Sequence, residues 1–154
     1  MSTTEILRVQ YTPDGDTVRC WRTVMDGVTG KTRAEPIRVR LAYIDAPEMN
    51  SAAYPRTWGL SARCYLRRLL ALHEPVKVII YSQDHYGRLL GEILRIRDDA
   101  NCGLRLVQGG YAALCNCPLS REDYQAAQAI AQRQRRGIWS QSGPWQTPWS
   151  DRIP

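Results

Sequence analysis

The stretch IRVRLAYIDAPE, residues 37–48, decides the fold, because strand-like alternation passes there into a polar corner. Apolar and other side chains alternate at first, which predicts a half-buried β-strand over Ile37–Ile44. Ile37, Val39, Leu41 and Tyr43 point to one face, and Arg38, Arg40 and Ala42 point to the other. Pro47 fixes its own φ and favours extended backbone at Ala46, so a rigid corner is expected after the strand.

Four other segments have the alternation or the β-branched and aromatic composition of strands. They are Glu5–Thr12, Thr17–Val24, Val76–Gln83 and Leu89–Ile96. A polar connection that contains glycine, Asp26–Pro36, is expected to join the second strand to the third.

Three helices are expected, at Thr57–Leu72, at Gly103–Val107 and from Ser120 through Tyr124–Arg136. A pair of glycines ends the second helix, and a sequence similar to a capping box begins the third at Ser120. Five short strands with a helix after the third predict a small closed barrel, of which the oligonucleotide-binding barrel is the familiar form. The 154 residues fit one domain over residues 1–140, followed by an irregular tail of Trp and Pro over residues 141–154.

The net charge of +6 favours a polyanionic partner. The chain has 19 Arg and only two Lys, which indicates either phosphate recognition by guanidinium groups or the base composition of the genome. Residues 49–73 carry four Arg and no acid, a face that either guides nucleic acid or is simply solvated.

No segment approaches the ~20 apolar residues of a membrane span, so we expect no membrane partner. The N-terminus lacks the features of a signal peptide, which predicts a cytoplasmic protein, or a secreted one if a leader was removed. Five dispersed cysteines are an odd number without zinc-ligand spacing, so reduced thiols are expected.

Acids stand in two places where strands are normally apolar. Asp14 and Asp16 flank a glycine and share a face if a strand has begun there, although a plain hairpin turn is the alternative. The corner after the third strand can aim Asp45, the Ala46 carbonyl and Glu48 into one volume. Carboxylate and carbonyl oxygens are the ligands that calcium takes.

A third motif, DHYGR at residues 84–88, is a tight connection between strands. Taken alone, it is a hairpin with a surface arginine. The three motifs together, in this order and spacing, are much more specific than any one of them.

With these motifs the chain resembles the staphylococcal-nuclease-like (thermonuclease) family over about Val9 to Ser140. The matching segments are D-G-D-T at 14–17, R-x-x-x-x-D-A-P-E at 40–48, D-x-Y-G-R at 84–88, G-Y-A at 110–112 and A-Q-x-x-A…G-I-W at 127–139. The resemblance implies an α+β fold, a five-stranded oligonucleotide-binding (OB) β-barrel with three helices.

The resemblance also implies site residues. Asp16, Asp45 and the Ala46 backbone carbonyl match calcium ligands, and Asp14 matches a supporting acid near the metal. Glu48 matches the proposed general base, and Arg40 and Arg88 match the two phosphate-binding arginines. Tyr86 and His85 match nucleotide-facing positions, although the family has lysine where His85 stands. The tyrosines that stack on the base in the archetype are absent, since the chain reads CNCP at 115–118.

The implied activity is that of a calcium-dependent nuclease acting on single- and double-stranded DNA and on RNA. It implies cleavage of the 5′ P–O bond, leaving 3′-phosphate products. No obligate protein partner is evident. Two alternatives remain open: a non-catalytic module on the same barrel that binds nucleic acid or a peptide, and an interaction protein whose basic charge is incidental.

Overall fold

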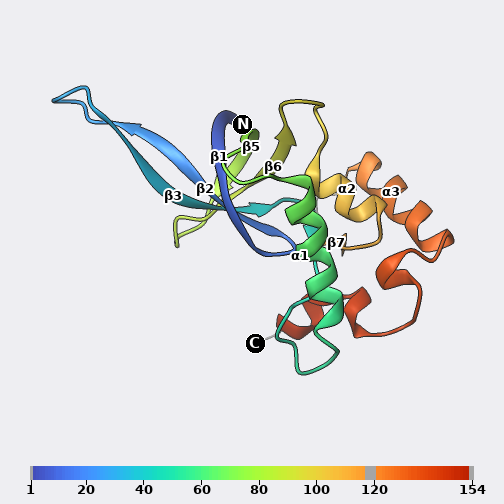
Figure 1. The fold of residues 1–154 in the computed structure, drawn as a ribbon. Helices are drawn as coiled ribbons and strands as arrows, with labels where there is room; N and C mark the ends of the chain where they lie inside the picture. Colours follow the sequence, from blue (N-terminus) through green and yellow to red (C-terminus); the bar gives the residue numbers. More distant parts are fainter. Residues whose placement is uncertain (1, 117–120, 153–154) are drawn as a thin grey trace.

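Five strands close into a barrel in the order β1-β2-β3-β6-β5, which confirms the expected fold (Figure 1). The structure is a computed structural model that describes residues 2–116 and 121–152. The barrel strands are β1 (Thr3–Asp14), β2 (Thr17–Met25), β3 (Thr32–Leu41), β5 (Pro75–Gln83) and β6 (Leu89–Arg95). All neighbouring pairs are antiparallel except β3 and β6, which run parallel from the pair Val39–Leu89.

The alternation of β3 is confirmed by burial, since Val39 and Leu41 lie in the barrel core and Arg38 is exposed. The strand ends earlier than expected, at Leu41 rather than Ile44. Tyr43 has a φ of 73°, a left-handed conformation that no strand can include. Ala42 is buried although it was expected on the outer face, because the backbone turns there.

After this turn the chain forms the two-residue strand β4 (Ile44–Asp45), which pairs with β7 (Ala113–Leu114). Neither short strand was predicted, since two residues carry no periodicity. The pairing ties the corner that follows β3 to a segment about seventy residues later in the chain.

The connection expected over Asp26–Pro36 is wrong in its second half. Strand β3 already starts at Thr32, which pairs with Met25, so the loop covers only residues 26–31. The two strands project beyond the barrel as a long ribbon (Figure 1). Pro36 lies within β3 at a register position opposite Trp21.

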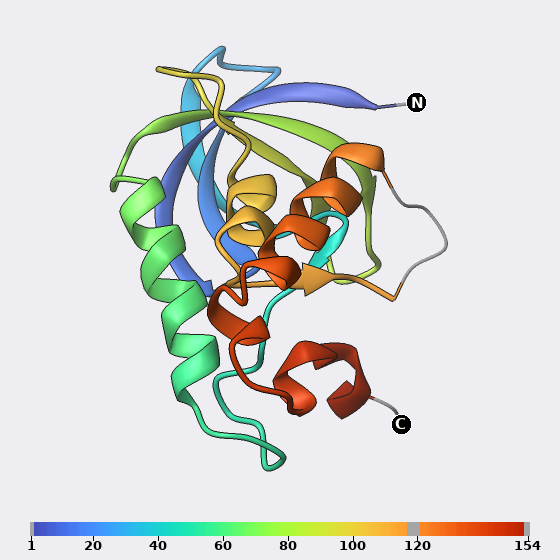
Figure 2. The ribbon, with the colours of Figure 1, turned by 90° about the vertical axis from the view of Figure 1, so that its right-hand side faces the viewer.

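Three helices cover the barrel, α1 (Thr57–Leu69), α2 (Cys102–Gln108) and α3 (Glu122–Arg133). Helix α1 runs along β1, and α2 and α3 lie side by side (Figure 2). The first helix ends before the expected Leu72 because Leu70 is extended, and the third ends before the expected Arg136. The capping box expected at Ser120 lies outside the described residues.

After α3 the chain forms three short 3₁₀ turns, Gly137–Trp139, Pro144–Gln146 and Pro148–Arg152, and the second of them contacts α1. Trp145 stacks on Trp58 with ring centroids 5.0 Å apart, and its Nε1 donates to the Ile138 carbonyl. No helix in the described ranges combines the length and the apolar character that crossing a bilayer requires.

Of the four cysteines that the structure describes, one differs from expectation, and Cys117 lies outside the described residues. Cys20, Cys64 and Cys102 are free thiols, and Cys115 is disulfide-bonded. The expectation that all the thiols are reduced is therefore wrong for Cys115.

Candidate functional site

Asp16 is placed by a glycine at the turn between β1 and β2. A Cβ on Gly15 would lie 2.5 Å from the Cβ of Ala62 and 3.0 Å from that of Ala46, so only glycine fits between α1 and the corner. The backbone carbonyl of Asp16 accepts a hydrogen bond from the Leu41 amide at 2.8 Å. The first motif is therefore fixed against the end of β3.

Asp16 also reaches the corner itself. The Ala46 amide donates to Asp16 Oδ2 at 2.9 Å, and Thr17 Oγ1 donates to Oδ1 at 3.4 Å. Asp45, held in β4 opposite Ala113, is buried with 2% of its surface exposed, and Asp16 has 6% exposed. The structure thus brings together Asp16, Asp45 and Ala46, the three residues that the family resemblance implies as calcium ligands.

Arg40 joins the two aspartates. Its Nη2 lies 3.4 Å from Asp16 Oδ2 and 3.3 Å from Asp45 Oδ1, and its Nη1 donates to the Leu41 carbonyl at 2.7 Å. Buried carboxylates need a nearby cation, because removal from water strongly disfavours an isolated charge. We call Asp16, Arg40 and Asp45 the acid–arginine cluster.

Glu48 follows the cluster at the start of the loop that leads to α1. The Glu48 amide donates to the Tyr54 hydroxyl at 2.7 Å. A Cβ on Gly59 would lie 2.8 Å from the carbonyl oxygens of Pro47 and Glu48, so the first turns of α1 pack directly on this backbone. Sequence reasoning missed Tyr54 and Gly59, which have no motif signal of their own.

Arg88 lies in a different contact network from the acid–arginine cluster. Its Nε is 3.0 Å from Asp84 Oδ2, and Asp84 Oδ1 accepts from the amides of Tyr86 and Arg88. Burial alone would raise the pKa of Asp84, but these hydrogen bonds outweigh it and the pKa is lowered. In the ranges described, the ion pairs of Arg40 and Arg88 involve different acids, so the structure does not join the two arginines through a shared carboxylate.

The remaining predicted residues lie in or beside two turns, between β1 and β2 and between β5 and β6. Asp14 is half-buried and pairs with Thr17 across the β1–β2 turn. His85 and Tyr86 contact each other with ring centroids 4.1 Å apart, and Tyr86 is 84% exposed. Among residues 2–116 and 121–152 there is no group of three or more His, Cys, Asp or Glu that could hold a metal ion.

A further buried acid, besides Asp16 and Asp45, was not predicted. Glu92, on β6, accepts hydrogen bonds from Tyr81, Asn101, Arg121 and Tyr124. The Arg121 guanidinium also lies over the rings of Tyr43 and Tyr124, at 5.3 and 5.2 Å from their centroids. With so many donors on one carboxylate, Glu92 serves to join β5, β6, α2 and α3.

A closed five-stranded barrel of this strand order, with polar side chains gathered at one edge, defines an oligonucleotide-binding-fold protein. Residues 38–141 match the model of the staphylococcal nuclease homologue family, and the chain belongs to that family. The resemblance drawn from the three motifs is thereby confirmed.

Several relatives are named as endonucleases. Endonuclease YhcR of Bacillus subtilis is 32% identical over an alignment 144 residues long, which covers 85% of this chain and 11% of that protein. An uncharacterized endonuclease of Escherichia coli O157:H7 is 30% identical over 142 residues, 92% of this chain and 81% of that protein. Probable endonuclease LCL3 of Paracoccidioides lutzii is 27% identical over an alignment 173 residues long, which covers 92% of this chain and 49% of that protein. The chain therefore spans less than two thirds of YhcR and of LCL3.

Proposed function

We propose that this chain is a calcium-dependent nuclease that hydrolyses the phosphodiester bonds of DNA and RNA. The observation that carries the proposal is the acid–arginine cluster, in which two buried carboxylates converge on one guanidinium group. Family membership and the names of the relatives support a nuclease. Calcium dependence and 5′ P–O cleavage, leaving 3′-phosphate products, are the finer parts of the proposal.

The chemistry of the donor set fits calcium. Asp16 and Asp45 supply two carboxylates, Ala46 supplies a carbonyl, and all are hard oxygen donors of the kind that calcium prefers. Asp16 and Asp45 carry two formal negative charges and Arg40 one positive charge, a formal charge balance within the cluster that favours a cation. When bound, calcium would act as a Lewis acid on a phosphate oxygen and offset its charge.

The chain's own residues would bind the phosphate and accept the proton of the attacking water. Arg40 presents a fork of donors at the cluster, and a guanidinium group binds phosphate oxygens with two parallel hydrogen bonds. We assign Arg88 the same role from the turn before β6. Glu48 would accept the proton of the attacking water, a contribution worth typically 10²–10⁴-fold.

A plasmid-nicking assay tests the proposal. Wild type should convert supercoiled DNA to the nicked form with calcium and not with excess chelator, and Asp45→Asn should be inactive. Asp99→Asn is the control, because Asp99 is exposed with a φ of 56°, which asparagine tolerates. Binding of DNA without any cleavage would instead establish the non-catalytic binding module. Equal cleavage in chelator would refute the calcium site.

A further inference from the structure

Two arginines stand directly opposite each other on the outer face of the β2–β3 ribbon. Arg19 on β2 is the register partner of Arg38 on β3. Val18, Cys20 and Val39 beside them are buried in the core, so both arginines point away from it. Like charges directly opposite in an antiparallel pair destabilise a sheet. Such a pair needs an explanation beyond folding.

The pair is not neutralised by acids. Arg19 Nη1 donates to the Tyr11 hydroxyl at 3.3 Å, and its guanidinium lies 5.7 Å from the centroid of that ring. No acid forms an ion pair with Arg19 or Arg38 in the part of the chain that the structure describes. Other arginines of the ribbon do have such partners: Arg22 pairs with Glu5 and Arg33 with Glu35.

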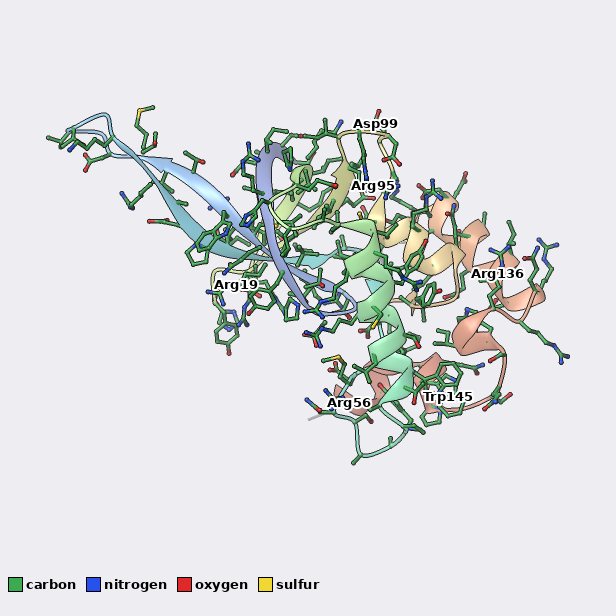
Figure 3. All side chains as sticks on the ribbon, in the orientation of Figure 1. Arg19, Arg56, Arg95, Asp99, Arg136 and Trp145 are labelled. Atoms are coloured by element: carbon green, nitrogen blue, oxygen red, sulfur yellow. The ribbon has the colours of Figure 1, made fainter. Side chains whose placement is uncertain are left out.

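Arg19 and Arg38 line an open groove of about 730 Å³ that also reaches the turn between β5 and β6. Arg88, Tyr86 and Gln83 form its far side, and Figure 3 shows Arg19 on the side of the ribbon that faces this turn. The acids of the groove are already engaged, since Glu35 pairs with Arg33 and Asp84 with Arg88. We call this feature the arginine groove.

The arginine groove and the acid–arginine cluster are neighbours along β3, which contributes Arg38 to the first and Arg40 to the second. Arg38 and Arg40 lie two residues apart on the same face of β3, a separation of about 7 Å along a strand. Arg88 directly precedes Leu89 on β6. Leu89 pairs with Val39, which lies between Arg38 and Arg40 on β3. A strand bound at Arg40 can therefore continue over Arg38 and Arg19.

We propose that Arg19 and Arg38 form a phosphate-binding subsite for a nucleic-acid strand, next to the point of cleavage. Two guanidinium groups on one phosphodiester match its oxygens, and binding relieves their mutual repulsion. Tyr86, exposed at the groove, offers a ring on which a base can stack. The proposal rests on the proposed function, because its ligand is the strand that the nuclease would cleave.

The test is the salt dependence of binding by the double variant Arg19→Gln/Arg38→Gln. A fluorescent single-stranded 12-mer is titrated in excess chelator, which prevents calcium-dependent cleavage, and anisotropy gives Kd at several salt concentrations. The slope of log affinity against log salt is negative. Loss of one phosphate contact reduces its magnitude by about 0.7, and loss of two contacts reduces it by about 1.4. We expect the double variant to bind more weakly than wild type, with a salt slope whose magnitude is smaller by an amount within that range.

The matched control is Arg105→Gln/Arg133→Gln, which removes the same charge from exposed positions on α2 and α3. Its slope should equal that of wild type. Equal slopes for the two double variants would overturn the subsite. Circular dichroism and thermal unfolding verify that both variants fold.

Two further measurements distinguish failure of the subsite from failure of the proposed nuclease function. Calorimetry with inorganic phosphate tests for a free anion, and binding as tight as that of the 12-mer would overturn a strand as the ligand. Cleavage with calcium tests the proposed function independently: an inactive wild type refutes the nuclease, while the change in salt slope still decides the subsite.

Discussion

At the scale of single residues, Arg40 is held by three acceptors, which lie in the β1–β2 turn, in β3 and in β4. Its contacts to Asp16, Leu41 and Asp45 fix the plane of the guanidinium group before any substrate arrives. Preorganised donors of this kind account for a large part of transition-state stabilisation in enzymes.

Arg40→Lys keeps the charge but loses the fork of donors, because an ammonium group is a compact point charge. We predict that kcat falls by at least about 10²-fold, the amount associated with one preorganised donor. Steady-state cleavage of single-stranded DNA measures it, with Arg133→Lys on α3 as the control. A rate within a few-fold of wild type would show that Arg40 has no special role.

The sequence singled out Asp16 and Asp45 because aspartates are unusual in strands, and the family resemblance added Arg40 as a phosphate-binding residue. The contact of Arg40 with both aspartates was not predicted. Tyr54 could not be predicted, since its contact with Glu48 depends on the path of the loop before α1. Glu92 was missed for a related reason. Its four donors come from segments that are brought together only by the closed barrel and its helices.

At the scale of elements, α1 positions the corner that carries Asp45 and Glu48. Gly15 and Gly59 both lie in tight contacts between this helix and its surroundings. Long elements were predictable from periodicity, as α1 and the barrel strands illustrate. The end of β3 was not, because the left-handed conformation of Tyr43 reflects tertiary packing.

Gly59→Ala tests the packing of α1 on the corner. The added methyl group would lie 2.8 Å from two backbone carbonyl oxygens, which cannot move independently of Pro47 and Glu48. We predict destabilisation of about 1–3 kcal/mol and a loss of cleavage rate. Urea unfolding provides the measurement. Gly27→Ala, which has open space around it, should behave like wild type, and equal behaviour of the two variants would contradict this packing.

At the scale of the whole molecule, the barrel and the helices are joined by the buried Glu92 network. Glu92→Ala removes the acceptor of several donors and leaves Arg121 without its buried partner. We predict a loss of about 3–5 kcal/mol in the free energy of unfolding, measured by urea titration. The exposed Glu122→Ala should change it by no more than about 1 kcal/mol. Similar losses in both variants would mean that the network contributes nothing specific.

The burial of two thiols gives a second prediction at this scale. Desolvation raises the pKa of Cys20 and of Cys102 to about 12, so almost none of either thiol is ionised at pH 8. Because the thiolate is the reactive form, iodoacetamide should modify Cys64 in the folded protein and the other two only after unfolding. Mass spectrometry of the alkylated peptides measures this. Rapid labelling of Cys20 in the folded protein would contradict the closed core.

The most direct test of the central claim is the thermal unfolding of wild type and Asp45→Asn at increasing calcium concentration. A ligand that binds only the native state stabilises it in proportion to RT ln(1 + [L]/Kd). With two carboxylates in the donor set, the midpoint should lie in the range of about 10⁻⁴–10⁻³ M that is typical of weak calcium sites. We predict that calcium raises the Tm of wild type and leaves that of Asp45→Asn unchanged. An equal rise in both proteins would show that calcium binds elsewhere and would contradict the assignment of the acid–arginine cluster.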